Sequence, residues 1–383
     1  MHFLDFVLRN LLRRKVRTAL TIVGVSVAIA AVVGLMSITG GYEESSKEVY
    51  ASHGIDMVVV RAGEAVTNGS TLDQSLAKRL QELDGVSKVS MALRDTVSIE
   101  GTSGLVPVNG WPLDSFNFDT LTILPPGRDL EASDKQAVLL GKTLAENLDK
   151  KVGDEVEIEG EKFTVVGIYD SGSIMEDRSA VMLLRAFQNL SSKDAQVSQF
   201  DITVKKDLSN RAAVLVALRQ QIEGLRGDDG NKLGLAAQAS DEFVKSDNQI
   251  RLAHAMAWIT SAIALIVGSI GMLNTMIVSV LERTQEIGIL RAIGWRKSRI
   301  ISMIMVESFT LSFAGAATGI LLAFALVQML ARFPAAQGVL SGGITIQIVI
   351  LAYLLSILVG LVGGGYPALR GASLPPTEAL RYE

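Results

Sequence analysis

Residues 282–300 read ERTQEIGILRAIGWRKSRI, and this charged stretch lies between two long apolar segments. Its charged side chains are two carboxylates, Glu282 and Glu286, and five bases, Arg283, Arg291, Arg296, Lys297 and Arg299. Short basic connectors between apolar segments are typical of the cytoplasmic side of membrane proteins. The connector therefore predicts that the segments on both sides of it are membrane spans.

Four stretches of the chain lack charge over the roughly 20 helical residues that cross a bilayer. The expected transmembrane helices are 18–40, 252–281, 300–331 and 344–366. A mean hydropathy of +0.34 alongside 20% charged residues fits this concentration of apolar side chains in a few places. A cleaved signal peptide is the alternative for 18–40, but its apolar run is about twice the usual h-region, with no A-x-A site. We interpret it as a retained anchor.

Basic residues in the leader 1–17 and in the connector 282–299 place both on the cytoplasmic side by the positive-inside rule. The short loop 332–343 contains only Arg332 among charged residues and is expected outside, and the tail 367–383 is then cytoplasmic. In the leader, charges recur every four residues opposite an apolar stripe. This spacing predicts an amphipathic helix in the membrane interface.

Residues 41–250 have mixed polarity and predict a large α+β domain outside the membrane. A strand at 54–63, a helix at 71–85 and a further strand are followed much later by the same order at 199–206, 208–224 and 232–240. The repeated order predicts one split domain, in halves 54–99 and 199–240, with a turn-rich, β-rich insertion at 100–198. The insertion includes a β-hairpin that turns at Glu159–Gly160. The long second span either tilts in the membrane or continues outward as a stalk that starts near residue 240. The first span can likewise extend outward as a stalk until Gly54.

Several classes of site find no support in the sequence. The chain has no cysteine, and its net charge of −4 gives no reason to expect nucleic acid as a partner. His2, His53 and His254 lack metal-ligand spacing. GKT at 141–143 lacks the first glycine of a Walker A loop, and LSGG at 340–343 falls on the expected outer side. We expect no catalytic, cofactor-binding or metal site on this chain.

Four stretches resemble the MacB/FtsX superfamily of ABC-transporter permeases, the mechanotransmission type. They are LRRKVRTALTIVGVSVAIAAVV at the start, AVLLGKTLAENLDKKVGDEVEIEGEKFTVVGIYDSGS in the outside domain, VSVLERTQEIGILRAIGWRKSRI at the connector, and YPALRGASLPPTEALRYE at the end. They occur in the order of the family and fit its arrangement of one plus three spans. The resemblance implies a bacterial inner-membrane protein with a porter-like outside domain.

The resemblance also implies a role for the connector. Permeases of this kind work as dimers, here a homodimer or a pair with a similar permease, with cytoplasmic ABC ATPase subunits that hold ATP and Mg²⁺. Residues 282–299 are similar to the coupling helix that docks in the ATPase. The implied docking residues are Glu282, Arg283, Glu286, Ile287, Leu290, Arg291, Ile293, Gly294, Arg296, Lys297 and Arg299. Ile287, Leu290 and Ile293 would form an apolar edge of this helix, while the bases pair with ATPase carboxylates or with lipid phosphates. Glu307, inside the third span, is expected to form an ion pair with a connector arginine.

Two functions stay open on this resemblance. The first is a non-catalytic permease subunit that exports or extracts an amphipathic, lipophilic or peptide cargo, with ATP hydrolysis on a separate subunit and a membrane-fusion protein as a further partner. The second is an FtsX-like activator of a cell-wall hydrolase, without transport. The size of the outside domain favours the first. A membrane-anchored enzyme, a third class, has no residue constellation to support it.

Overall fold

A computed structural model describes residues 15–63, 71–102, 104–173, 175–205, 210–227, 229–330 and 343–373. The chain divides into two compact units. The helical unit comprises 1–41, 252–336 and 342–383, and the sheet unit comprises 42–251 and 337–341. Three of the predicted parts lie largely outside the described residues: the leader up to residue 14, the outer loop up to residue 342, and the tail from residue 374 onward.

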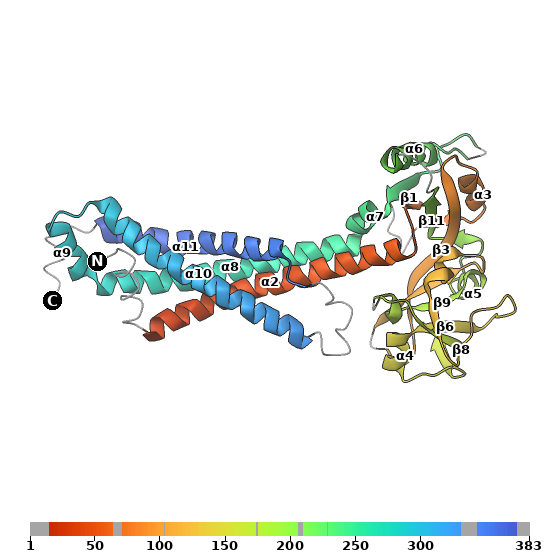
Figure 1. Ribbon diagram of the computed structural model, residues 1–383, viewed down its shortest axis with the longest axis horizontal. Helices are drawn as coiled ribbons and strands as arrows, with labels where there is room; N and C mark the ends of the chain where they lie inside the picture. Colours follow the sequence, from red (N-terminus) through yellow and green to blue (C-terminus); the bar gives the residue numbers. More distant parts are fainter. Residues whose placement is uncertain are drawn as a thin grey trace. The chain divides into compact units, whose positions relative to one another are not determined.

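Among the described residues, four helices are long and apolar enough to cross a membrane, in agreement with the four predicted spans. They are α2 (Lys15–Ser52), α8 (Asn248–Glu282), α10 (Lys297–Leu330) and α11 (Ile346–Ser373), and the short α9 (Thr284–Ala292) lies between α8 and α10 (Figure 1). Each helix is longer than its predicted span. In α11 the helix continues through Pro367, where the sequence predicts a tail, and Pro367 and the small residues Ala368 and Gly371 are all buried there.

Small residues let the membrane helices pack closely. The Ser308 hydroxyl of α10 donates a hydrogen bond to the carbonyl oxygen of Gly360 in α11. A Cβ atom on Gly364, one turn further along α11, would overlap the Ser308 side chain. On its other side α10 meets α2, where a Cβ on Gly319 would lie 2.7 Å from the Ser26 carbonyl oxygen. Close approach of this kind stabilises helix pairs in membranes, where burial of apolar surface contributes little.

The sheet unit is built on one mixed ten-stranded sheet. Its strand order is β12-β1-β11-β3-β4-β9-β6-β8-β5, with β7 also paired to β8. The strands are β1 (Met57–Arg61), β3 (Val86–Ser98), β4 (Leu105–Trp111), β5 (Thr122–Leu124), β6 (Ala137–Gly141), β7 (Glu155–Ile158), β8 (Glu161–Asp170), β9 (Ala180–Leu183), β11 (Gln199–Val204) and β12 (Leu235–Ala239). β2 (Leu72–Asp73) and β10 (Gln196–Val197) form a separate pair.

The long strand β3 joins the two parts of the sheet. Its first half pairs with β11 between Val86 and Ala92, and its second half pairs with β4 between Leu93 and Ser98. The strands before this switch come from both ends of the unit's sequence, whereas β4 to β9 come from its middle. The sheet unit is thus an α+β domain with a β-rich insertion, as the sequence predicts. At the predicted hairpin, Glu159 and Gly160 have φ of 51° and 82° between β7 and β8, the two positive values of a type I′ turn.

Short helices complete the unit: α3 (Leu76–Gln81), α4 (Lys142–Leu148), α5 (Leu184–Leu190), α6 (Arg211–Glu223), α7 (Ser240–Ser246), and the 3-10 turns η1 (Phe116–Thr120) and η2 (Glu176–Arg178). Apolar side chains such as Leu80, Leu93 and Phe200 fill the core. Tyr169 lies in a second cluster, with its hydroxyl oxygen 3.0 Å from the carbonyl oxygens of Glu176 and Ser179. Burial raises the pKa of the Tyr169 phenol well above its ordinary value.

Two sequence predictions for this unit are wrong in detail. The helix predicted at 71–85 is shortened to α3, because Leu72 is buried in the β2–β10 pair and Asp73 accepts a hydrogen bond from the Ser75 N–H, which turns the chain. The second stalk is not continuous with its span. Asp247 has an extended backbone (ψ 126°) that separates α7 from α8, and its side chain accepts the Gln249 N–H at the start of α8.

Candidate functional site

The charged connector forms a distinct helix at one end of the helical unit (Figure 1). It is α9, which starts directly after α8 and stops at Ala292. Gly294 then takes φ of 103°, a left-handed conformation that favours glycine, and α10 starts at Lys297. The backbone thus turns twice within fifteen residues, and α9 is held between two membrane helices.

One face of α9 packs into the helical unit. Ile287 is only 2% exposed, Gly288 is buried, and Leu290 is half-buried against the same apolar cluster. Across the contact, a Cβ on Gly371 of α11 would lie 3.8 Å from the Ile287 side chain. The predicted apolar edge of Ile287, Leu290 and Ile293 is therefore not one exposed edge, because its first two members complete the core of the unit.

The opposite face of α9 is exposed, and we call it the outer face: Gln285, Glu286, Ile289, Ala292 and Ile293. These positions follow the three- and four-residue spacing of one helix side. Ile289 is 48% exposed and Ile293 73% exposed, beside the carboxylate of Glu286. Sequence reasoning missed Ile289. Its signal was the spacing itself, since Glu286, Ile289 and Ile293 are spaced three and four residues apart, as on one side of a helix.

Two ion pairs hold the helix ends around α9. The guanidinium of Arg17, in the first turn of α2, contacts both carboxylate oxygens of Glu282 at 2.6 and 2.8 Å. Arg283 Nη1 lies 3.0 Å from Glu307 Oε2, and the two side chains are only 9% and 8% exposed. Arg283 is thus the connector arginine that faces the carboxylate of the third span. The two pairs link the ends of α2, α8 and α10 through adjacent residues of one connector.

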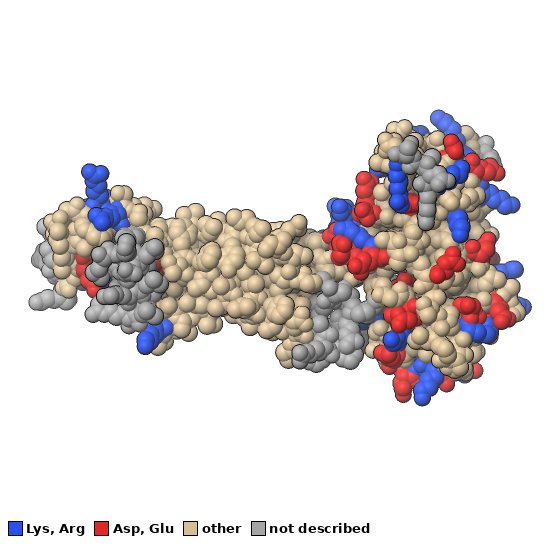
Figure 2. Space-filling view, viewed as in Figure 1, with Lys and Arg blue, Asp and Glu red and all other residues tan. Residues whose placement is uncertain are grey.

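Of the other bases of the connector, Arg291 lies in the last turn of α9, and Arg296, Lys297 and Arg299 follow it. Arg291 Nη1 donates to the carbonyl oxygen of Trp295 at 3.3 Å, and the Arg299 guanidinium stacks 4.3 Å from the centre of the Trp295 ring. Arg296, Lys297 and Arg299 are exposed. Figure 2 shows Lys and Arg side chains at this end of the helical unit, whereas the middle of its visible face carries no charge. The distribution fits a membrane boundary close to α9.

The outer face of α9 has no chemically reactive constellation, but its residues suit a contact with another protein. An exposed apolar pair, an acidic residue and flanking bases offer a small helical face that a groove in another protein can bury. Within the described parts of the chain, no three His, Asp or Glu side chains are placed to hold a metal ion.

Comparison with known protein families agrees with this architecture. A family described as the MacB-like periplasmic core domain matches residues 18–222, and a family described as the FtsX-like permease C-terminal region matches 258–376. With four membrane-length helices, these matches define an integral membrane protein with a large extracytoplasmic domain. The chain belongs to the MacB/FtsX-like family of ABC transporter permeases, as its sequence resemblance indicates.

Relatives of two lengths are similar to this chain. It is 28% identical to the "Macrolide export ATP-binding/permease protein MacB" of Bdellovibrio bacteriovorus, over 98% of this chain and 61% of that protein. It is 27% identical to the "Uncharacterized ABC transporter permease MJ1507" of Methanocaldococcus jannaschii, over 99% of this chain and 98% of that one. The "Uncharacterized ABC transporter permease YknZ" of Bacillus subtilis is 25% identical, with 98% of each chain covered. The chain thus spans about three fifths of the MacB relative and nearly all of the other two.

Two solved structures are similar to part of the chain. The periplasmic region of MacB from Actinobacillus actinomycetemcomitans has 14% identity and a TM-score of 0.39, covering 51% of this chain and 94% of that one. The extracellular domain of the ABC-type transporter YknZ from Gram-positive bacteria has 18% identity and a TM-score of 0.37, covering 48% of this chain and 98% of that one.

Proposed function

We propose that this chain is the non-catalytic permease subunit of an ATP-driven transporter and that the outer face of α9 docks with a cytoplasmic ABC ATPase. The observation that carries the proposal is the exposure of Ile289 and Ile293 beside Glu286 on a helix whose other side packs on the apolar core of the helical unit. ATP and Mg²⁺ would be held by the ATPase. We place the chain in the inner membrane of a bacterial cell, with α9 and both termini on the cytoplasmic side.

Burial of Ile289 and Ile293 in a partner would favour docking. Full burial of an isoleucine side chain contributes roughly 1.5–3 kcal/mol, and each 1.4 kcal/mol changes affinity about tenfold. Arg296 and Lys297 can add pairs with ATPase carboxylates or with lipid phosphates at the rim, where exposed pairs contribute little affinity but guide association. We therefore assign the specificity of the contact to the two isoleucines and Glu286.

Motion of the ATPase would reach the outside domain through helices α2 and α8. α2 has 38 residues without a break, roughly 57 Å at 1.5 Å per residue, against a hydrocarbon core of about 30 Å. Both α2 and α8 contribute residues to both units of the chain. The ion pairs Arg17–Glu282 and Arg283–Glu307 join these helices beside α9. A displacement of α9 would thus act on the helix ends together.

The transporter would contain two such permeases, either identical or similar, and would export or extract an amphipathic, lipophilic or peptide cargo. The name of the MacB relative includes macrolide export, which supports an amphipathic cargo. A membrane-fusion protein outside the membrane is a further proposed partner.

Docking is tested by co-purification. The ATPase is first identified as the subunit that co-purifies with the wild-type permease. In the double variant Ile289→Asp, Ile293→Asp, the amount of ATPase retained should fall at least tenfold, because two charges replace the apolar pair that docking would bury. Leu105→Asp is the matched control, since Leu105 is 66% exposed and lies in the sheet unit. Equal retention by the double variant and the control would show that the outer face does not dock the ATPase.

A further inference from the structure

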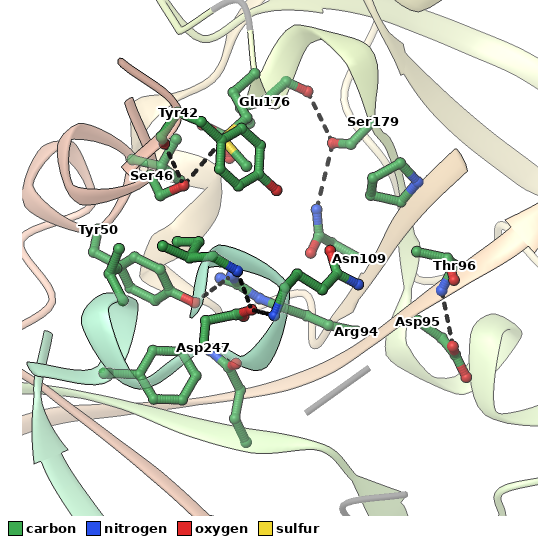
Figure 3. Close-up of a pocket in the computed structure, with 18 of the residues that line it drawn as sticks. Tyr42, Ser46, Tyr50, Arg94, Asp95, Thr96, Asn109, Glu176, Ser179 and Asp247 are labelled. Atoms are coloured by element: carbon green, nitrogen blue, oxygen red, sulfur yellow. Dashed lines mark hydrogen bonds between the residues drawn. The ribbon is translucent and has the colours of Figure 1, made fainter. Parts of the chain in front are cut away.

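The sheet unit contains a cavity of about 200 Å³ that is separate from α9 (Figure 3). Its walls include Tyr42 and Tyr50 of α2, Arg94 of β3, Val108 of β4 and Phe243 of α7. The residues at the start of α8 close it further. The last turns of α2, the α7–α8 junction and the sheet therefore all contribute to one cavity.

Arg94 contacts Tyr50 and Asp201 in the wall of the cavity. Its Nη1 donates to the Tyr50 hydroxyl at 3.0 Å, and its guanidinium lies 5.1 Å from the centre of the Tyr50 ring. Nη2 forms an ion pair with the buried Asp201 Oδ2 at 3.7 Å, a separation too long for a hydrogen bond, and the buried Nε has no partner among the described residues. A guanidinium has five N–H donors, so this side chain can accept a further anionic partner.

The carboxylates near Arg94 already have partners. Asp201 accepts hydrogen bonds from the side-chain amides of Gln199 and Asn117. Asp247, which lines the cavity, accepts the backbone N–H groups of Gln249 and Ile250.

Two further carboxylates line the cavity. Asp95 is paired with Lys193 at 2.8 Å. Glu176 is paired with His53 at 2.8 Å; its second oxygen has no partner in the described chain, but the side chain is only 4% exposed and is enclosed by protein. Arg94 keeps 18% of its side chain exposed. Arg94 is the one cationic side chain among the described residues of the lining, where Asp95, Glu176 and Asp247 are the carboxylates.

Part of the remaining wall is apolar, and uncharged polar side chains such as Ser46, Asn109 and Gln199 line the rest. Val49, Met175, Val244 and Ile250 line the cavity, and the rings of Tyr50 and Phe243 pack edge to face with centres 5.6 Å apart. An apolar cavity of roughly 150 Å³ holds one benzene ring. The space beside Arg94 is thus large enough for one ring or a short alkyl chain.

We propose that this cavity binds a small amphipathic anion. A carboxylate or phosphate group would pair with the Arg94 guanidinium, and an alkyl or aromatic body would lie against Tyr50 and Phe243. Because the walls come from α2, from the α7–α8 junction and from the sheet, the ligand contacts three elements at once. The site does not depend on docking of an ATPase to α9.

The test is calorimetric titration of the full chain in nanodiscs of zwitterionic lipid. Sodium octanoate and octyl phosphate should each bind saturably with one site per chain, whereas octylammonium, with the same alkyl chain, should not. Arg94→Gln should weaken octanoate binding at least tenfold, and Arg94→Lys should restore part of it. The matched control is Arg219→Gln, since Arg219 is an exposed arginine paired with Glu223 and Glu242 elsewhere in the sheet unit.

A second variant protects the test against misfolding of Arg94→Gln. Val49→Phe fills the apolar part of the cavity while keeping Arg94, and it should abolish octanoate binding with an unchanged melting curve. The proposal is overturned if octylammonium binds more tightly than octanoate, or if the Arg94→Gln or Val49→Phe chain binds octanoate like wild type. Adding phosphatidylglycerol to the nanodiscs identifies the source: competition with octanoate points to a lipid headgroup, and its absence points to a soluble anion.

Discussion

Arg283 and Glu307 carry opposite charges in a nearly enclosed position of the helical unit. Removing a charge from water is costly, and a pair in this position persists because each partner compensates the other. Arg283 lies between α8 and α9, and Glu307 lies in the third turn of α10. The role of the pair at this scale is to fix where the connector starts relative to α10.

Breaking the pair should destabilise the protein. Glu307→Leu leaves the Arg283 charge buried without this partner, a change that costs about 3–5 kcal/mol in comparable pairs. The double variant Arg283→Met, Glu307→Leu should recover most of the loss. The measurement is the melting temperature of the full chain in detergent, with Glu286→Gln on the exposed outer face as control. A Glu307→Leu protein that melts at the wild-type temperature would contradict this account of the pair.

Among the elements, α10 and α11 depend on small residues along their contact. Gly364 faces Ser308, whereas its neighbour Gly365 has no heavy atom within 4 Å of the position of an added Cβ. The same substitution therefore has opposite consequences at adjacent positions of one helix.

Gly364→Ala should destabilise the chain by about 1–3 kcal/mol, the usual cost of overpacking. Gly365→Ala should be neutral or stabilising by up to about 1 kcal/mol, because alanine is the better helix former. Melting temperatures of both variants, measured side by side in the same detergent, provide the comparison. Equal effects would mean that the α10–α11 contact is looser than described.

How far the sequence predicts this molecule also depends on the element. The spans were predictable because a bilayer excludes charge, and the α+β class followed from the repeated strand–helix–strand order. The sequence does not predict which side of α9 is exposed, because isoleucine occurs on both sides: Ile287 completes the core and Ile289 faces outward. Nor could the cavity be predicted, since Arg94 is an ordinary residue of a long strand until Tyr50, 44 positions earlier, packs against it.

For the whole molecule, the proposed orientation puts α9 and the sheet unit on opposite sides of the membrane. The chain has no cysteine, so single cysteines can be labelled without background. Ser298→Cys, beside α9, and Glu161→Cys, in the sheet unit, both replace exposed residues.

In intact cells, or in spheroplasts where an outer membrane blocks access, an impermeant maleimide should label Glu161→Cys. It should label Ser298→Cys only after lysis, because a charged reagent does not cross the bilayer. A denatured sample of each variant checks that both cysteines react. Labelling of Ser298→Cys before lysis would reverse the orientation and remove the cytoplasmic docking site.

The central claim is that ATPase motion passes from α9 to the outside domain, and the most direct measurement is a distance between two spin labels. Glu48→Cys, an exposed position of α2 in the sheet unit, is labelled in the assembled complex of two permeases with their ATPase. Its inter-label distance distribution, recorded by pulsed electron paramagnetic resonance, should shift when a non-hydrolysable ATP analogue binds. The shift should disappear in the Ile289→Asp, Ile293→Asp variant. An unchanged distribution in a complex that binds the nucleotide and hydrolyses ATP would contradict the account.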